Sequence, residues 1–388
     1  MTERAYLDWN ATAPLRPEAR AAMAAALDLP GNPSSIHAEG RAVRAAIERA
    51  RAQVAALFAV EPADVTFTSG GTEANGLALN PEIQVSGGGR SFDRLLVSAI
   101  EHPAVLGGGR FAPSAVEILP VTPEGLLDLV ALQRALTGPG RPLVSVMLAN
   151  NETGILQPVP EAAHLVHEAG GLLHVDAVQA PGRVAVEVGN LGADLVSVSA
   201  HKLGGPKGVG ALIRRSDAIH IATPLMRGGG QERGIRAGTE NVAGIVGFGA
   251  AAEICRLRLA DEAAHQRKLQ KRLEDGIRAA SPGSVIFGAG AARLPNTTLV
   301  ALPGLKAETA VIACDLAGLA VSSGSACSSG KVEPSHVLAA MGVAPALAQG
   351  AVRVSLGFGS SEADIEMFLK TWKKLSESLG RERRGIAA

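Results

Sequence analysis

Residues 195–202 read Leu-Val-Ser-Val-Ser-Ala-His-Lys, an apolar strand pattern that ends in an imidazole and an amine. In open α/β sheets, ligands bind beyond the carboxyl ends of the strands. Lys202 would therefore point into such a crevice, with Ser199 and His201 beside it. An amine held there, its pKa lowered by desolvation or by a neighbouring cation, can form a Schiff base with an aldehyde cofactor. The alternative is that Lys202 is an ordinary cation of a surface loop.

Other short apolar runs precede this one and are separated from it by turns or by stretches of helix length. They cover residues 65–68, 95–98, 143–148 and 172–175. This alternation of strands and helices predicts an α/β domain with a mostly parallel sheet covered by helices. Helical spacing of apolar residues predicts helices over about 17–27, 35–58 and 240–280, the second of them capped by Ser34 or Ser35.

After residue 280 the predicted elements become shorter and mixed. We expect strands near 285–287, 298–300 and 352–355, and helices near 307–316 and from about 361. The chain is therefore expected to divide into a large domain over 15–255 and a smaller α+β domain made of 1–14 and 256–388.

Composition narrows the classes of function. The 388-residue chain is 47% hydrophobic, and Lys plus Arg number 37, as do Asp plus Glu, so neither a nucleic-acid surface nor a membrane surface is expected. The N-terminus has no signal peptide and no apolar run reaches 18 residues, which predicts a cytoplasmic protein. Three cysteines are too few for a disulfide framework or a zinc cluster, and no metal site is expected.

Polar residues follow three more of the predicted strands. His102 and Asn151 come after two of them, and Asp176 ends a third, with Gln179 three residues later. An aspartate at a strand end can pair with the protonated pyridine nitrogen of pyridoxal phosphate, although capping of a following helix is the commoner use. Together with Lys202, four strand ends would deliver polar groups to one edge of the sheet, which favours a shared site.

A candidate phosphate cradle lies between the strand at 65–68 and the next helix. Gly70 and Gly71 let the backbone approach a ligand closely, and Thr72 opens a helix whose free N–H groups favour an anion. The pattern matches neither the dinucleotide fingerprint nor the P-loop, so it gives little support to a nucleotide site.

Cys327 lies in the run Ser322-Ser323-Gly324-Ser325-Ala326-Cys327-Ser328-Ser329-Gly330. Small, hydroxyl-bearing neighbours do not explain a core cysteine, and they predict a thiol on a mobile, solvent-reachable loop. Taken alone, the run is equally compatible with a Ser/Gly turn that happens to hold a cysteine. Cys255 and Cys314, in helical patterns, are interpreted as buried structural thiols.

These motifs, taken together, resemble those of the pyridoxal-phosphate-dependent cysteine desulfurases of the NifS/IscS type, within the class V aminotransferases. The resemblance runs from Leu7-Asp8 to about Leu356. It is carried by Ser69-Gly70-Gly71-Thr72-Glu73, Glu101-His102-Pro103, Asn150-Asn151-Glu152-Thr153-Gly154, Asp176-Ala177-Val178-Gln179, His201-Lys202, Arg236-Ala237-Gly238-Thr239-Glu240-Asn241 and Ser323-Gly324-Ser325-Ala326-Cys327.

The resemblance implies a fold-type-I homodimer with pyridoxal 5'-phosphate as cofactor. Such an enzyme takes sulfur from L-cysteine, leaves L-alanine, holds the sulfur on Cys327 as a persulfide and passes it to an acceptor or iron–sulfur scaffold protein. By position, Lys202 would bind the cofactor covalently, His102 would stack on its ring and assist proton transfer, and Asp176 would pair with the pyridine nitrogen.

The remaining roles follow from the same resemblance. Asn151 and Gln179 would contact the ring substituents or the substrate, and Arg353 would bind the substrate carboxylate through its bidentate fork. Thr239 would reach the phosphate held by the neighbouring subunit. The residues that would hold the phosphate within one subunit are Gly71, Thr72, Ser199 and His201.

The sequence departs from the family pattern at two places. Trp9 stands where asparagine is common, and Gly357-Phe358-Gly359-Ser360-Ser361 replaces the more usual Arg-Phe-Thr-Thr. Neither departure is expected to touch the chemistry, but both leave the branch of the family open. The competing hypotheses are a selenocysteine lyase, another class V aminotransferase, or a non-catalytic sulfur-transfer scaffold; the presence of both Lys202 and Cys327 argues against the scaffold.

Overall fold

A seven-stranded sheet forms the centre of the molecule. The computed structural model describes residues 4–87, 91–324 and 335–386. The strands in spatial order are β2 (Val65–Thr68), β9 (Gly210–Arg214), β8 (Leu195–Ser199), β7 (Leu172–Asp176), β6 (Pro142–Met147), β4 (Arg94–Ser98) and β5 (Val116–Leu119). From β8 to β5 all neighbours are parallel, whereas β9 is antiparallel to both of its neighbours. The predicted α/β class with a mostly parallel sheet is confirmed.

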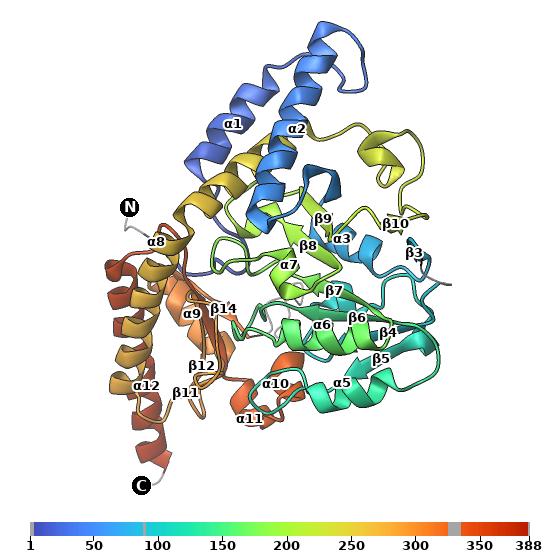
Figure 1. Cartoon of the computed structure of the whole chain (residues 1–388). Helices are drawn as coiled ribbons and strands as arrows, with labels where there is room; N and C mark the ends of the chain where they lie inside the picture. The colour runs from blue at the N-terminus through green and yellow to red at the C-terminus, as the bar shows by residue number, and fades with distance from the viewer. Residues whose placement is uncertain (1–3, 88–90, 325–334, 387–388) are drawn as a thin grey trace.

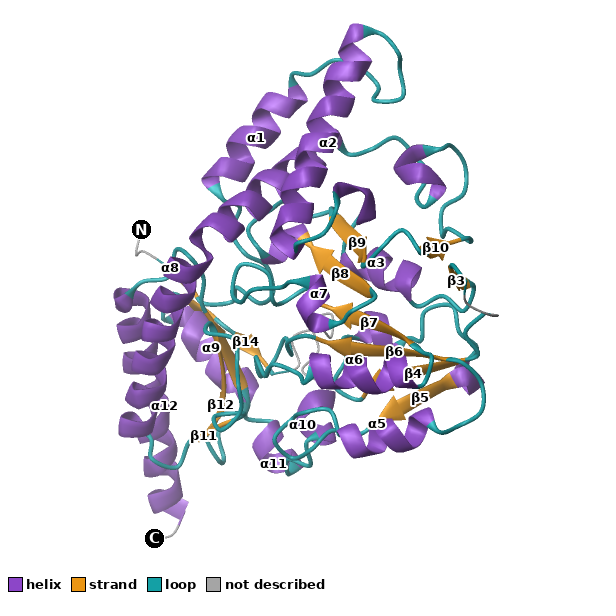
Figure 2. Cartoon of the chain, in the orientation of Figure 1, coloured by secondary structure: helices purple, strands orange, loops and turns teal. Residues whose placement is uncertain are grey.

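Both faces of this sheet are apolar because helices cover both of them. Leu96, Val144 and Leu173 pack on one face, in a core shared with the buried residues of α2 (Ala38–Phe58), α6 (Val159–Glu168) and α8 (Val242–Ala280). Their sequence neighbours Leu95, Leu143 and Leu172 face the other side and pack with α3 (Gly71–Ala78). Figure 2 shows the strands enclosed between these helical layers.

A second, smaller sheet is antiparallel and lies beside the first. Its order is β11 (Val285–Ile286), β12 (Thr297–Ala301), β15 (Val352–Ser355) and β14 (Ser322–Ser323). A core of its own joins it to the second half of α8, to α9 (Ala307–Leu316) and to α12 (Glu362–Ile386). Figure 1 shows α12 running alongside the lower part of α8, next to this sheet.

The N-terminal segment packs on the second sheet. Strand β1 (Ala5–Tyr6) pairs in parallel with β13 (Leu319–Ala320), and Asp8 forms a bridge with Ser355 of β15. The expected division at residue 255 falls inside α8, which runs without a break past both sheets. The two-domain division therefore stays a prediction.

The shorter elements complete the chain. The other helices are α1 (Pro17–Leu27), α4 (Pro103–Leu106), α5 (Leu129–Leu136), α7 (Val188–Leu191), α10 (His336–Ala340) and α11 (Pro345–Ala348), with 3-10 turns at Pro62–Asp64, Pro113–Ala115, Ala200–Lys202 and Gln231–Gly234. Strands β3 (Ile83–Val85) and β10 (Ile219–Ile221) form an antiparallel pair. Within the described residues, no helix is long and apolar enough to cross a membrane.

One predicted helix start is wrong. Helix α2 begins at Ala38, and its cap is His37, whose ring accepts a hydrogen bond from the N–H of Gly40. Ser35 instead donates its N–H to the carbonyl of Asn32 in a turn that includes Pro33. Serine is the commoner cap residue, but here Ser34 and Ser35 lie in the turn before the helix, ahead of the cap position.

The two departures from the family pattern lie against each other. The indole of Trp9 is buried, donates to the carbonyl of Tyr6 at 2.9 Å and packs edge-on to Phe358 with ring centroids 4.8 Å apart. A Cβ atom added at Gly357 would lie only 1.9 Å from the Trp9 ring. Trp9 therefore fills the space that a side chain at position 357 would need.

We predict that Gly357→Ala lowers the free energy of unfolding by about 1–3 kcal/mol, because the core around Trp9 would be overpacked. Chemical denaturation measures this change. The matched control is Gly359→Ala, whose added Cβ would meet Trp9 at an ordinary 3.6 Å. Equal free energies of unfolding for the two variants would contradict the packing argument. So would a decrease on Gly357→Ala that is as large in a Trp9→Ala background as in the unmodified protein.

Candidate active site

Four neighbouring strand ends deliver polar groups to one cavity of about 270 Å³. Strands β4, β6, β7 and β8 are adjacent and parallel, so their carboxyl ends lie at the same edge of the sheet. The residues that they bring to the cavity are His102, Asn151, Asp176 and Lys202. The sequence-based expectation of one shared edge therefore agrees with the geometry.

Lys202 ends a 3-10 turn directly after β8, and its amine faces the N-terminal segment. Its Nζ donates to the carbonyl oxygens of Asn10 and Ala11, the latter at 2.9 Å. The lysine lines the cavity, and these two backbone acceptors orient its amine.

Asn10 links the N-terminal segment to both sheets. It is almost fully buried; its carbonyl also accepts from Gln179 Nε2 at 3.0 Å, and its Nδ2 donates to Thr297 Oγ1 at 2.9 Å and to the Asn151 carbonyl at 3.1 Å. Sequence reasoning did not select Asn10 or Ala11 as site residues. The signal available was their place in the N-terminal motif, between Asp8 and Thr12.

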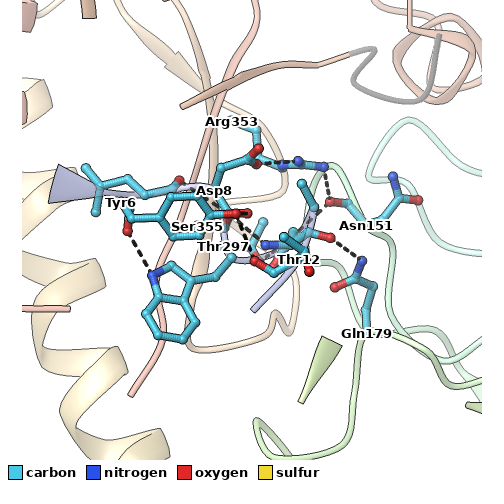
Figure 3. A network of polar contacts seen from close by, with 12 residues as sticks. Tyr6, Asp8, Thr12, Asn151, Gln179, Thr297, Arg353 and Ser355 are labelled. Carbon is cyan, nitrogen blue, oxygen red and sulfur yellow. Dashed lines mark hydrogen bonds and ion pairs between the residues drawn. The ribbon is translucent and has the colours of Figure 1, made fainter. Parts of the chain in front are cut away.

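Arg353 reaches the cavity from β15 of the second sheet. Its Nη2 donates to Asp8 Oδ1 at 2.8 Å and its Nη1 to the carbonyl of Asn151 at 3.0 Å, while its buried Nε has no partner among the described residues. Figure 3 shows Arg353 joined to Asp8 and Asn151, with Gln179 reaching toward the same segment. The guanidinium thus keeps N–H groups for a ligand.

Asp176 is held by two donors at the end of β7. Asn75 Nδ2 donates to its Oδ2 at 2.8 Å, and the N–H of Val178 donates to its Oδ1 at 3.0 Å. This local turn replaces the helix cap considered from the sequence, because no helix follows until α7. Asn75, on α3, was also missed; only its position in the first helix after the Gly-Gly turn pointed to it.

His102 caps α4, and this cap fixes its tautomer. Its Nδ1 accepts from the N–H of Ala104 at 3.1 Å, so the proton of the neutral ring lies on Nε2. Burial lowers the pKa of His102, and the nearby Lys202 and His336 add to the effect against the opposing carboxylate of Asp176. At neutral pH the imidazole is therefore uncharged.

Glu101 lies behind His102 and is completely buried. Its Oε1 accepts from the N–H of Met147 at 2.5 Å, and its Oε2 has no partner among the described residues. Burial raises the pKa of Glu101 well above its usual range, and Asp176 adds to the rise. Burial and the neighbouring carboxylate therefore both oppose a second negative charge beside Asp176.

A second hollow of about 410 Å³ adjoins the cavity and has the donors of an anion site. It shares Gly71, Thr72, Ser199 and His201 with the cavity and adds the cation of Lys207. The first N–H groups of α3 have no carbonyl partner within the helix, and the helix begins at this hollow with Gly71 and Thr72. Burial, then Lys202 and Lys207, lowers the pKa of His201 to about 4, so its ring is neutral.

Close packing at Gly71 and the backbone conformation at Gly70 favour the glycine pair in this hollow. A Cβ at Gly71 would lie 2.8 Å from Val178 Cγ2, and Gly70 has φ +159°. The carboxylate of Asp176, the amine of Lys202 and the donors of the anion site therefore line two adjoining hollows, and these are groups that would hold the ring nitrogen, the aldehyde and the phosphate of pyridoxal 5'-phosphate. Within the described residues, no group of three His, Cys, Asp or Glu side chains could hold a metal ion.

One predicted site residue is not at this cavity, and another cannot be placed relative to it. Thr239 is exposed in the loop before α8 and lines neither hollow. Cys327 lies outside the described residues. Cys255 and Cys314 are buried as predicted, and burial raises the pKa of each thiol to about 11, so both are protonated at neutral pH.

Comparison with known proteins agrees with this geometry. Residues 5–368 match the family model described as aminotransferase class-V. The chain is 44% identical to a cysteine desulfurase of Cereibacter sphaeroides, with 97% of each chain covered, and 40% identical to the cysteine desulfurase IscS of Dictyoglomus turgidum, with 98% of this chain and 96% of the relative covered. The crystal structure of a NifS-like protein from Rickettsia africae superposes with a TM-score of 0.86 at 34% identity, covering 97% of this chain and all of that chain.

The chain belongs to the aminotransferase class-V family. Within that family, its relatives place it in the group of cysteine desulfurases of the NifS/IscS type. Enzymes of this group depend on pyridoxal 5'-phosphate, which is also the cofactor that the donors around the two hollows fit.

His174 gives a pH prediction for the sheet beneath the cavity. Its ring is fully buried between the hydroxyls of Ser145, at 2.8 Å, and Ser197, at 2.9 Å, and burial lowers its pKa to about 4. Between about pH 6.5 and about pH 4 the unfolded state binds a proton that the folded state does not. The contribution of His174 to the free energy of unfolding is therefore fully present above about pH 6.5 and is lost as the pH falls through this range.

We therefore predict that the destabilisation caused by His174→Asn is smaller at about pH 5 than at neutral pH, by about 2 kcal/mol. Denaturation curves at both pH values measure the difference. His164→Asn, at an exposed position on α6, is the matched control. A cost of His174→Asn that does not change with pH would show that the buried ring does not stay neutral.

Proposed function

We propose that the chain is a cysteine desulfurase that converts L-cysteine to L-alanine, holds the sulfur on Cys327 as a persulfide and passes it to an acceptor protein. The observation that carries this proposal is the cavity shared by Lys202, Asp176 and Arg353. It combines an amine for an aldehyde cofactor, a carboxylate for its ring nitrogen and a guanidinium for the carboxylate of an amino acid.

The segment that contains Cys327 is attached at both ends to residues next to the cavity. Before it, Ser322 pairs with Arg353, and the N–H of Gly324 donates to the carbonyl of Ala351 at 2.9 Å. Cys327 follows Gly324 by three residues, so chain length alone keeps the two Cα atoms within roughly 11 Å. This short tether supports a nucleophile that serves the cavity.

After the segment, two side chains bind to the loops that follow β4 and β6. Ser335 donates to the buried carboxylate of Glu152, and His336 Nε2 donates to the carbonyl of Glu101 at 3.0 Å. Both acceptors are sequence neighbours of proposed site residues, His102 and Asn151. The described residues on each side of the segment are therefore both held next to the cavity.

The other roles are proposed from the resemblance and from the contacts. Asp176 pairs with the pyridine nitrogen, His102 stacks on the ring and moves protons, and Asn151 and Gln179 contact ring substituents or the substrate. In a homodimer, Thr239 reaches the phosphate of the second subunit, which agrees with its absence from the cavity of its own chain. The residues proposed to hold the phosphate are Gly71, Thr72, Ser199 and His201.

The reaction then divides between the cofactor and the side chains. When bound, pyridoxal 5'-phosphate withdraws electrons from the substrate Cα and weakens the bonds around it. Arg353 holds the substrate carboxylate, Lys202 accepts and returns protons, and the neutral His102 donates the proton of its Nε2 and takes it back. The Cys327 thiolate bonds to the substrate sulfur as the carbon–sulfur bond breaks. The electron pair of that bond stays on the carbon skeleton, which takes up protons to become alanine.

The acceptor class is proposed more broadly, as a protein of iron–sulfur cluster assembly or of thiolation. Reduction or transfer of the persulfide regenerates the Cys327 thiol for the next cycle. This places the enzyme before a reaction that consumes sulfur at the oxidation level of a persulfide.

We predict that Lys202→Ala loses the visible absorbance of the bound cofactor, whereas Cys327→Ala keeps it but loses sulfide release from L-cysteine. A spectrum of each purified variant and a sulfide assay with a thiol reductant measure the two effects. Cys314→Ala, which removes a buried thiol, is the control for loss of a cysteine.

Two results would contradict the proposal in different ways. Undiminished desulfuration by Cys327→Ala would exclude the persulfide route. Absence of any bound chromophore in the unmodified protein expressed with the cofactor would exclude a pyridoxal-phosphate enzyme.

We also predict that Arg353→Lys raises KM for L-cysteine by about tenfold or more, because a lysine cannot reproduce the bidentate fork. Steady-state kinetics separate this effect from a change in kcat. Lys268→Ala, which removes an exposed cation on α8, is the matched control. An unchanged KM in Arg353→Lys would refute the proposed carboxylate contact.

A further inference from the structure

Arg183 is a fully buried cation without a carboxylate partner among the described residues. Its Nη1 donates to the backbone carbonyl of Gln179 at 2.6 Å and to Gln179 Oε1 at 2.5 Å, and its Nη2 donates to the carbonyl of Trp9 at 3.4 Å. All three acceptors are neutral oxygens. Other buried arginines have a carboxylate: Arg51 pairs with Glu232, and Arg16 pairs with Glu262.

Such an arrangement is costly, since a buried charge is normally paired. Burial and the nearby guanidinium of Arg353 lower the pKa of Arg183 to about 9, which still leaves it charged at neutral pH. An apolar side chain of similar size would avoid the buried charge but could not donate to these three carbonyl oxygens. The contacts of Arg183 therefore point to a task that requires a donor at this place.

The partners of Gln179 define that task. A guanidinium only donates hydrogen bonds, and a backbone carbonyl only accepts them. Gln179 is placed between the guanidinium of Arg183 and the carbonyl of Asn10, so a single orientation of its amide satisfies both: Oε1 toward Arg183 and Nε2 toward Asn10. The flipped amide would set two donors against each other and two acceptors against each other.

The fixed orientation decides what Gln179 offers to the cavity. One hydrogen of Nε2 is used by Asn10, and the second has no acceptor among the described residues. Because Gln179 lines the cavity, this second hydrogen is available to a ligand atom that accepts hydrogen bonds.

We infer that Arg183 is a positioning residue that holds Gln179 as a hydrogen-bond donor to an oxygen substituent of the cofactor ring. The inference rests on the proposed function, since it takes pyridoxal 5'-phosphate as the ligand of the cavity. Arg183 itself does not line this cavity, so it acts through Gln179.

The first test measures the affinity of the cofactor-free protein for pyridoxal 5'-phosphate in Arg183→Met. Loss of an oriented hydrogen bond is expected to weaken binding by about tenfold, and Arg183→Lys, which keeps a donor, is expected to recover part of the loss. The matched control is Arg214→Met, another buried arginine, which pairs with Leu195 at the start of β8, at the sheet edge opposite the cavity, and contacts Ile219, Ala63 and Asp64. Its affinity should equal that of the unmodified protein.

Thermal unfolding of the cofactor-free variants separates positioning from structure. Because Arg183 carries an unpaired buried charge, Arg183→Met is expected to unfold no earlier than the unmodified protein. Weaker cofactor binding together with a lost fold would instead mean that Arg183 is structural, and would overturn the inference.

A double variant tests whether Arg183 acts through Gln179. The affinity of Arg183→Met with Gln179→Ala is expected to match that of Gln179→Ala alone. If the loss of affinity in the double variant equals the product of the losses in the two single variants, Arg183 acts independently of Gln179 and the inference is overturned. Unchanged affinity in Arg183→Met would overturn it as well. If the unmodified protein binds no pyridoxal 5'-phosphate, the proposed function itself fails, which is a different result.

Discussion

Asn10 is the buried residue that connects the two sheets beside the cavity, and its backbone carbonyl makes the central contacts. It accepts from the amine of Lys202 at the end of β8 and from the amide of Gln179 after β7, while the Asn10 side chain binds Thr297 of the second sheet. A buried polar group must find a partner or lose the free energy of its hydration. The N-terminal segment can therefore adopt only the register that satisfies all of these groups, and this register fixes the direction of the lysine.

Charge around the cavity is limited in the same way. Burial opposes the charged forms of Glu101, His102 and His201. Arg353 keeps the Asp8 carboxylate as its partner. Arg183 is the exception, since its guanidinium donates to the side-chain amide of Gln179 and has no carboxylate partner among the described residues. This leaves Lys202, Lys207 and the Arg353 guanidinium as the cations that a carboxylate or phosphate ligand meets in the two hollows.

The sequence was sufficient for five of the seven strands and for the four strand ends, because apolar runs and the groups that follow them are local signals, but it did not indicate β5 or the antiparallel β9. It was insufficient for Asn10, Asn75 and Arg183, whose roles depend on partners distant along the chain. The Trp9 departure was expected to have no bearing on the site. Its carbonyl accepts from Arg183 and its ring excludes a side chain at Gly357, so it belongs to the layer that supports the cavity.

The most direct measurement is the mass of the protein and of its peptides after a single exposure to L-cysteine without a thiol reductant. A persulfide route requires the peptide that contains Cys327 to gain one sulfur atom while one L-alanine is formed, and requires that neither change occur in Lys202→Ala. Alanine formed with no sulfur on Cys327, or sulfur gained instead by Cys255 or Cys314, would contradict the proposed coupling between the lysine cavity and the Cys327 segment.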